Sequence, residues 1–393
     1  MGDRSRTEGD FGQPRPRLRP AWPNAEVPSY AATMKKVAVL TSGGDAPGMN
    51  GAIRAVTLIA ASRGIEVRGV RDGYLGLMAG DFVPLSPDVV GEIHSAGGTI
   101  LGSARSARFR TPEGRGEALQ QLSRAGIDGL VVVGGNGSLT GLAALLDDAG
   151  GSLRGIGIPA SIDNDVGYTR LAIGVDTAVN TIVDACDKLL DTAGSHGRAF
   201  IVEVMGRRCG YLAMAAAVAG GAHAVLFPEA GKDPDHLVDT VLRAIRSRST
   251  KPRNRRCALI LKAEGVDVSL ETLQDAVTRK IEAEDLGMDV RGITLGHVVR
   301  GGRPSAMDRM VATRLGHGAM QGLLSGESGR MVSWASGLSF PPDITSPVSG
   351  DPRTCLVDLD AVLEETEAML TGESSFIAWR SRVFGELEEV FGQ

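Results

Sequence analysis

An alternation repeated along the chain from Lys35 constrains the fold more than any other feature: short apolar runs rich in β-branched residues, then glycine-rich turns, then helical stretches. The first unit is a run at 37–41 followed by a helical stretch at 52–62, and a later one is a run at 130–133 followed by a helical stretch from 142. Strands that alternate with helices build parallel sheets from βαβ units. The pattern therefore predicts an α/β protein.

A second series of the same kind begins near Val175. It predicts helices at 177–192, 212–219 and 237–247 and strands at 200–204 and 258–261. The length of 393 residues suits two domains of roughly 100 to 200 residues each. We predict two doubly wound, Rossmann-like domains of three layers. Their expected bounds are 34–171 plus 300–350 for the first and 172–299 plus 351–393 for the second, with helical stretches at 362–370 and 376–391 packed on the second.

Residues 1–33 differ from the rest, because they contain five prolines and five arginines and almost no apolar periodicity. Such a composition buries too little surface to offset the entropy of ordering. We expect a disordered extension. The alternative is that Met34 is the natural start of the protein.

The composition excludes several classes of protein. A net charge of −5 lacks the strongly basic surface of a dedicated nucleic-acid binder, so no nucleic-acid partner is expected. The four cysteines form no C-x-x-C pair, and no stretch approaches 18 consecutive apolar residues, so neither a zinc ribbon nor a membrane span is indicated. A cytoplasmic protein is expected.

Glycine is enriched to 53 residues, and two of its clusters follow predicted strands. These are T-S-G-G-D-A-P-G-M-N at 41–50 and G-G-N-G-S at 134–138. Glycines at the carboxyl end of a strand let backbone N–H groups approach an anion, and the next helix N-terminus favours negative charge. One such turn is often only a tight connection, but two in one sheet favour a nucleotide or polyphosphate. The segment from Gly102 to Arg110 adds arginines between them.

A third motif, P-A-S-I-D-N-D at 159–165, places Asp163 and Asp165 two residues apart after an apolar run. In an extended segment both carboxylates point to the same side, which suits one as a general base and the other near a metal or a hydrogen-bond network. From spacing alone, a polar surface turn is the simpler interpretation.

Taken together and in order, these motifs resemble the bacterial A-type ATP-dependent 6-phosphofructokinases. The resemblance runs from about Met34 to beyond Asp308 and includes V-E-V-M-G-R-R-C-G at 202–210, A-E-G at 263–265 and L-G-H-V-V-R-G-G at 295–302. It implies transfer of a phosphoryl group from ATP to the 1-hydroxyl of fructose 6-phosphate in glycolysis, with Mg²⁺. It also implies that the first domain binds ATP and the second fructose 6-phosphate, in a homotetramer or homodimer.

The resemblance carries roles to individual residues. Asp163 matches the catalytic base, with Asp165 beside it and Arg207 supporting the developing charge. Positions matching ATP contacts are Gly43, Arg105, Ser106, Gly135, Asn136, Gly137 and Ser138. Positions matching sugar-phosphate contacts are Ser161, Asp163, Met205, Gly206, Arg207, Glu264, His297 and Arg300, with Arg198 and Arg291 reaching the 6-phosphate from a neighbouring subunit.

Two residues depart from the pattern of the family, and two others bear on the choice of phosphoryl donor. Asn136 stands where the family has the aspartate associated with Mg²⁺, so weaker metal binding is expected. Ser161 replaces the usual threonine and keeps its hydroxyl. Gly137 and Ala160 stand where pyrophosphate-dependent relatives carry aspartate and lysine, which favours ATP.

Other readings stay open. They are a pyrophosphate-dependent or mixed-substrate enzyme, one that phosphorylates another sugar phosphate, and a catalytically weak regulatory member that senses sugar phosphates. Asn136 motivates the last of these, while retention of Asp163 beside a full acceptor set argues against it.

Overall fold

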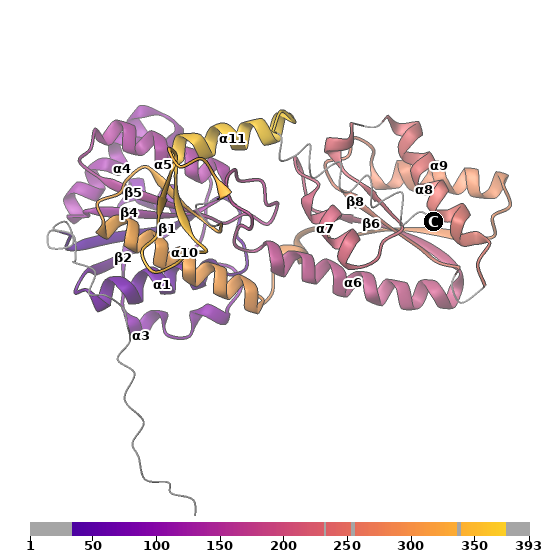
Figure 1. Cartoon of the computed structure of the whole chain (residues 1–393), viewed down its shortest axis with the longest axis horizontal. Helices are drawn as coiled ribbons and strands as arrows, with labels where there is room; N and C mark the ends of the chain where they lie inside the picture. Colours follow the sequence, from indigo (N-terminus) through magenta and orange to yellow (C-terminus); the bar gives the residue numbers. More distant parts are fainter. Residues whose placement is uncertain (1–33, 232, 253–255, 336–338, 375–393) are drawn as a thin grey trace, which may run out of the picture.

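The computed structural model describes residues 34–231, 233–252, 256–335 and 339–374. It has two lobes, each built around its own sheet, and α6 (Val175–His196) runs from the junction between them along the smaller lobe (Figure 1). The expected extension 1–33 and the expected helix 376–391 lie outside the described residues.

The larger lobe holds an eight-stranded sheet in the order β11-β12-β10-β5-β4-β1-β2-β3 within the described ranges. The central strands β10, β5, β4, β1 and β2 are parallel, and antiparallel partners extend the sheet at both edges. The strands are β1 (Lys36–Ser42), β2 (Glu66–Val70), β3 (Phe82–Leu85), β4 (Gly129–Gly134), β5 (Arg154–Pro159), β10 (Arg330–Ser333), β11 (Thr345–Pro347) and β12 (Cys355–Asp358).

Helices cover both faces of this sheet (Figure 1). On one face α1 (Met49–Ser62) packs on α10 (Ala306–Leu324), and a Cβ on Gly316 would lie 2.7 Å from the Cβ of Ala55, so glycine allows this close approach. The opposite face carries α4 (Pro112–Ala125), α5 (Asn136–Ala149) and α11 (Leu359–Thr371). The remaining elements of the lobe are α2 (Gly73–Ala79), α3 (Pro87–Val90), η2 (Ile93–Ser95) and η3 (Arg108–Arg110).

The smaller lobe holds a parallel sheet in the order β7-β8-β6-β9. Its strands are β6 (Arg198–Val204), β7 (Ala224–Leu226), β8 (Ala258–Ala263) and β9 (Asp289–Thr294). Helices α6 and α7 pack together, as do α8 and α9, and Figure 1 shows them around the sheet. These elements are α6 (Val175–His196), α7 (Tyr211–Ala219), α8 (Pro234–Ser249), α9 (Leu270–Ala283), η4 (Pro228–Ala230) and η6 (Gly296–Arg300).

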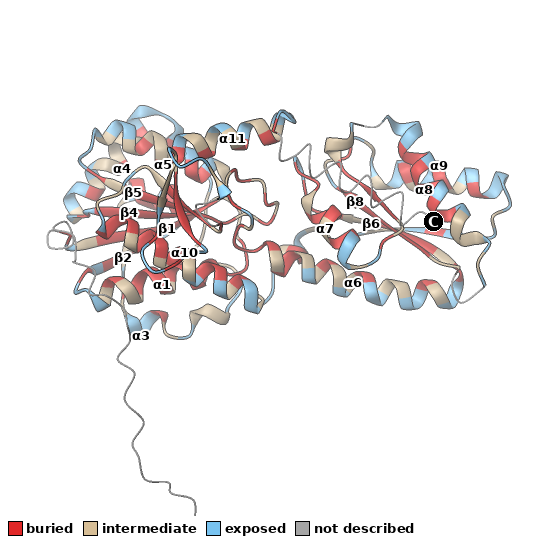
Figure 2. Ribbon diagram, viewed as in Figure 1, coloured by how far each residue is buried: buried red, intermediate tan, exposed pale blue. Residues whose placement is uncertain are grey.

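The buried side chains follow the sheets in both lobes (Figure 2). All six residues of β4 are buried, as are all six of β8, because helices cover both faces of these central strands. The expected α/β architecture of two doubly wound domains is confirmed. The larger sheet is mixed rather than wholly parallel.

The expected placement of 351–393 in the second domain is wrong for the described part of that segment. Strand β12 pairs antiparallel with β10 in the larger sheet, and α11 packs on α5 of the same lobe. The backbone N–H of Gly167 also donates to Thr366 of α11 at 2.8 Å. The segment belongs to the first lobe because its apolar residues complete that core.

Candidate active site

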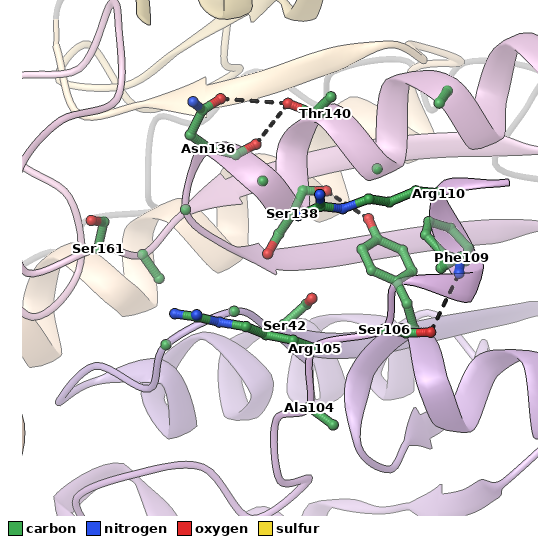
Figure 3. A pocket seen from close by; sticks show the side chains of 18 of the residues that line it. Ser42, Ala104, Arg105, Ser106, Phe109, Arg110, Asn136, Ser138, Thr140 and Ser161 are labelled. Atoms are coloured by element: carbon green, nitrogen blue, oxygen red, sulfur yellow. Dashed lines mark hydrogen bonds between the residues drawn. The ribbon is translucent and has the colours of Figure 1, made fainter. Parts of the chain in front are cut away.

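A cavity of about 760 Å³ opens at the carboxyl ends of β1, β4 and β5 (Figure 3). Strand β1 has β2 on one side and β4 on the other, so the chain winds in opposite directions from this point. Ligands of open α/β sheets bind at such a position. The cavity is lined by all seven residues expected to contact ATP, namely Gly43, Arg105, Ser106, Gly135, Asn136, Gly137 and Ser138.

The two glycine turns pack against each other at this edge. Gly43 has a left-handed φ of 90°, and a Cβ there would lie 3.2 Å from Oγ of Ser138. A Cβ on Gly134 would come within 2.5 Å of both Oγ of Ser138 and the backbone oxygen of Ser42. Only glycine permits these contacts, which explains its enrichment in both motifs.

The second turn ends in the N-terminus of α5, whose N-cap is Gly135. The first two helical residues, Asn136 and Gly137, therefore present backbone N–H groups and the positive end of the helix dipole to the cavity, while the N–H of Ser138 donates to the backbone oxygen of Gly135 at 2.9 Å. Asn136 accepts from the hydroxyl of Thr140 through its backbone oxygen at 3.0 Å and through Oδ1 at 3.4 Å. In Figure 3 Asn136 and Thr140 lie on one side of the cavity and Arg105 on the other.

An aromatic pair forms a wall of the cavity that the sequence motifs did not indicate. The rings of Tyr74 and Phe109 stack with centroids 3.9 Å apart and planes at 13°. The Tyr74 hydroxyl donates to the backbone oxygen of Ser138 at 2.6 Å, and a Cβ on Gly141 would lie 2.9 Å from the Tyr74 ring. The only sequence signal was that Phe109 lies in the arginine-rich segment after Gly102.

Two further arginines line the same cavity. Arg115 donates to Asp148 at 2.7 Å and to the backbone oxygen of Arg110 at 2.8 Å. Of the arginines expected near this turn, Arg105 and Arg110 line the cavity, whereas Arg108 pairs with Glu117 instead. Arg115 was not indicated by the sequence.

The loop after β5 brings Ser161, Asp163 and Asp165 into the cavity. It is a turn rather than the extended segment expected from the sequence, and Asn164 adopts a left-handed φ of 50°. The Asn164 side chain fixes this conformation by donating to Arg170 O at 3.1 Å and accepting from Ala172 N at 3.0 Å. The two carboxylates therefore share the cavity for a reason that differs from strand alternation.

Asp163 and Asp165 are in different environments. Asp165 accepts a hydrogen bond from the Ser161 hydroxyl at 2.8 Å. Oδ1 of Asp163 is buried and has no hydrogen-bond partner among the described residues. Burial above all, and then the charge of Asp165, raises the pKa of Asp163 to about 7; the charge of Arg300 opposes this shift and that of Glu264 adds to it. Such a group is suited to accept a proton near neutral pH.

Arg300 enters the cavity from η6 and lies over the first glycine turn. Its Nη1 donates to the backbone oxygen of Asp45 at 3.1 Å, and a Cβ on Gly44 would lie 2.7 Å from the same nitrogen. A guanidinium is thus held close to Asp163, where it can pair with an anionic group of a substrate.

The other expected sugar-phosphate residues of the smaller lobe do not line this cavity. Met205, Gly206 and the exposed Arg207 follow β6, and the exposed Glu264 follows β8. The backbone N–H of Gly265 donates to Gly206 O at 3.1 Å, which joins the two loops. His297 is exposed on η6, the helix that also carries Arg300. The charge of Glu264 nevertheless reaches Asp163.

Arg198 and Arg291 lie elsewhere. Arg198 is the first residue of β6, at the end opposite to the Met205 turn, and it pairs with Asp289 at 3.3 Å. Arg291 pairs with the same carboxylate at 2.8 Å. Neither side chain is among the residues that line the cavity of its own chain.

A magnesium ion would find oxygen ligands but no complete protein cage. No group of three or more His, Cys, Asp or Glu side chains suited to a metal occurs among the described residues. Asp165 offers a carboxylate on the cavity and Asn136 an amide oxygen. Mg²⁺ is commonly held by one or two carboxylates together with substrate phosphates, so this donor set fits the ion.

None of the helices in the described ranges is long and apolar enough to cross a membrane.

Comparison with known proteins agrees with this geometry. The sequence model of the family described as Phosphofructokinase matches residues 36–323. An ATP-dependent 6-phosphofructokinase of Halothermothrix orenii is 44% identical over 326 residues, which cover 81% of this chain and 96% of that protein. One from Thermotoga neapolitana is 48% identical over 300 residues, covering 76% and 90%.

Solved structures show the same similarity. The T-state crystal structure of Pichia pastoris phosphofructokinase superposes with a TM-score of 0.77 at 30% identity, over 91% of this chain and 40% of that longer chain. A family match over most of the chain, together with relatives well above 40% identity, establishes the assignment. This chain belongs to the phosphofructokinase family.

Proposed function

We propose that this protein transfers the γ-phosphoryl group of ATP to the 1-hydroxyl of fructose 6-phosphate, giving ADP and fructose 1,6-bisphosphate, as a kinase of glycolysis. The observation that carries the proposal is the state of Asp163 Oδ1 in the cavity bounded by two glycine turns and Arg300: this oxygen is buried, and no residue in the described part of the chain forms a hydrogen bond with it. The relatives named ATP-dependent 6-phosphofructokinase support it.

The acceptor half of the site prepares the sugar hydroxyl. Asp163, whose pKa is raised to about 7, accepts the proton of the 1-hydroxyl while the hydroxyl oxygen of the sugar bonds to the γ-phosphorus. The bond from that phosphorus to the bridging oxygen of ATP breaks, and ADP leaves with the electron pair. Arg300 and Arg207 supply positive charge for the sugar phosphate and the transferred group, with Glu264, His297 and Met205–Gly206 as the other sugar contacts.

The donor half positions ATP. The N-terminus of α5 and the turn at Gly43 provide backbone N–H groups for phosphates, with Arg105 and Ser106 beside them. The stacked Tyr74 and Phe109 provide an apolar surface on the same cavity. Phosphoryl transfer depends chiefly on positioning and electrostatic stabilisation, and this arrangement provides both.

Magnesium would offset the negative charge of the phosphates when bound. Asp165 is the carboxylate in position to hold it, together with the amide oxygen of Asn136, which leaves Asp163 free to act as the base. Because an amide lacks the full charge that attracts a hard cation, we expect weaker metal binding than an aspartate at 136 would give.

The room in the cavity beside Gly137 and Ala160 supports ATP rather than pyrophosphate as the phosphoryl donor. A Cβ on Gly137 would meet nothing within 4 Å, so the cavity is open at this position. Ala160 also lines the cavity and provides no cation. Both features leave room for the α-phosphate of a nucleotide.

We further infer a homo-oligomer, a tetramer or a dimer, in which Arg198 and Arg291 contact the 6-phosphate of a neighbouring subunit. Their position at the far end of the smaller sheet from the Met205 turn supports this role. A cytoplasmic location completes the proposal, and the four cysteines, which form no disulfide with one another, agree with a reducing compartment. Light scattering on the purified protein measures the oligomer directly.

The test of the proposed function is a coupled assay for fructose 1,6-bisphosphate with ATP or pyrophosphate as donor. Activity with ATP that is lost in Asp163→Asn supports the proposal. Activity with pyrophosphate, or a preference for another acceptor such as sedoheptulose 7-phosphate, identifies a different member of the family. Binding of fructose 6-phosphate without turnover with either donor identifies a sensor.

A further inference from the structure

Lys262 is the largest side chain among the fully buried residues of the structure, with an exposed fraction of 1%. It lies on β8 in the smaller lobe, whose other five residues are alanine, leucine and isoleucine. A buried ammonium group costs several kcal/mol in lost hydration and is tolerated only when it is paired. Its presence in an otherwise apolar strand therefore requires an explanation.

The partner of Lys262 lies on the neighbouring strand. Nζ of Lys262 donates to Oε2 of Glu203 at 2.8 Å and approaches the backbone oxygen of Ala263 at 3.4 Å. Oε1 of Glu203 accepts from the hydroxyl of Thr294 at 3.3 Å. The side chains of three strands are thus joined in one chain of polar contacts.

Strand register explains why these residues meet. Glu203 is paired with Lys262 on one side and with Thr294 on the other, so all three occupy one row across β8, β6 and β9. Two residues earlier, on the same face of the sheet, Ile201 of β6 is paired with Ile260 of β8. The polar row is therefore confined to the carboxyl ends of the strands.

Each of these strands leads directly into a loop of the proposed acceptor site. Met205, Gly206 and Arg207 begin two residues after Glu203, and Glu264 lies two residues after Lys262. Thr294 precedes η6, which carries His297 and Arg300. The ion pair lies immediately below all three loops, and neither member lines the cavity beside Asp163.

Backbone hydrogen bonds connect the same loops. Glu264 N donates to Val204 O at 2.8 Å, and Leu295 N donates to Glu203 O at 2.9 Å. These bonds align neighbouring strands, but none involves the side chains that reach a substrate. The Lys262–Glu203–Thr294 row adds a side-chain constraint at the point where the three loops diverge.

We propose that Lys262 and Glu203 are positioning residues of the acceptor site, which fix the three loops relative to one another so that Arg207, Glu264 and Arg300 converge on one sugar phosphate. The proposal rests on the proposed function. An apolar pair of similar volume would fill the same space at lower cost in hydration, so stability alone does not account for two charges here. A misplacement of about 1 Å in such a site costs up to roughly 100-fold in rate.

The experiment compares Lys262→Met and the double variant Lys262→Met/Glu203→Leu with the wild type, using the full chain. The Michaelis constants for fructose 6-phosphate and for ATP are measured separately, together with the melting temperature. We expect the Michaelis constant for fructose 6-phosphate to rise about 10-fold or more in both variants, while that for ATP changes less than about twofold. Binding of fructose 6-phosphate measured by calorimetry is expected to weaken in parallel.

The double variant separates positioning from stability. It leaves no unpaired buried charge, so we expect its melting temperature to recover relative to Lys262→Met while its affinity for fructose 6-phosphate stays low. Recovery of both quantities, or an equal rise of both Michaelis constants, would overturn the proposal. Arg246→Met is the matched control, because Arg246 forms an exposed ion pair with Glu284 at 2.7 Å in the same lobe; its Michaelis constants are expected to equal those of the wild type.

If Lys262→Met yields no folded protein, Thr294→Val tests the proposal instead. This variant removes the hydroxyl that donates to Glu203 and keeps the charged groups of both Lys262 and Glu203. An unchanged Michaelis constant for fructose 6-phosphate in that variant contradicts the proposal. A wild type that does not phosphorylate fructose 6-phosphate contradicts the proposed function instead, so the two failures are distinguishable.

Discussion

The guanidinium group of Arg300 lies so close to Gly44 that a Cβ on the glycine would come within 2.7 Å of Nη1. Gly44 does not adopt a left-handed φ, so alanine fits its backbone and the conflict is with the Arg300 side chain alone. The two residues are far apart in sequence, and their contact joins the first glycine turn to the helix η6 of the acceptor side.

The first prediction concerns Gly44→Ala. We expect the new methyl group to displace the Arg300 guanidinium and raise the Michaelis constant for fructose 6-phosphate by roughly 10-fold to 100-fold, the value of one or two hydrogen bonds to a charged group. Steady-state kinetics with ATP held at saturation measure this effect. An unchanged constant would show that Arg300 does not contact the substrate from this position.

Gly116→Ala is the control for this variant. Gly116 lies in α4, and a Cβ there would meet nothing within 4 Å. Alanine in a helix interior is favoured over glycine by up to about 1 kcal/mol. This variant is expected to be slightly more stable than the wild type and to keep its Michaelis constants.

The second prediction concerns the pH dependence of activity. Because burial raises the pKa of Asp163 to about 7, its base form is lost as the pH falls through neutrality. We expect kcat/KM for fructose 6-phosphate to decline tenfold per pH unit well below that value. The sugar phosphate itself titrates near pH 6, so Asp165→Asn serves as the control. Removing this like charge lowers the pKa of Asp163, and the acid limb moves to lower pH; a limb that does not move belongs to the substrate.

The third prediction concerns stability. The pKa of Asp163 is higher in the folded protein, about 7, than in an unfolded chain, about 3.9, so the folded state binds the proton more tightly. The stability that this tighter proton binding gives the folded protein is fully present below the pKa of the unfolded chain and is lost as the pH rises through 7. Each pKa unit corresponds to about 1.4 kcal/mol.

Asp163→Asn, which is neutral at every pH, therefore has the larger free energy of unfolding at pH 8. The advantage shrinks as the pH falls and disappears near pH 4. Urea unfolding at several pH values measures it. Asp147→Asn, at an exposed position in α5, is the control for an aspartate-to-asparagine change outside the cavity. A constant difference across the pH range for Asp163→Asn would contradict the assigned pKa.

The sequence predicts the central strands of the fold because their signals are local. Strands β1 and β4 contain continuous apolar runs, at 37–40 and 130–133, and each strand leads through a glycine-rich turn into a helix. The C-terminal strands are different, since β12 has only four residues and pairs antiparallel with β10 across a long connection. Nothing in a four-residue run specifies its partner, which is why the sequence places β12 and α11 in the wrong domain.

The candidate site was predictable where its chemistry lies within one motif. Asp163 and Asp165 were expected to face the same side, and they do, but through the left-handed conformation of Asn164 rather than through strand alternation. Tyr74 and Phe109 were missed because they are distant in sequence and meet only when α2 and η3 pack together. Lys262 carried no signal, since one lysine at the end of an apolar run is usually exposed.

The fourth prediction concerns Asn136, the residue that departs from the resemblance to the family. Its amide lies at the N-terminus of α5 on the cavity that also holds Asp163 and Asp165. A carboxylate at this position restores the charge that attracts a hard cation, and the helix dipole favours an anion there. We therefore expect Asn136→Asp to lower the Mg²⁺ concentration for half-maximal activity several-fold. A magnesium titration at fixed ATP measures the change. Asn136→Ala is the matched control: if the amide oxygen of the wild type ligates the ion, this variant requires more Mg²⁺ than the wild type. An equal requirement in all three proteins would show that position 136 does not contact the metal.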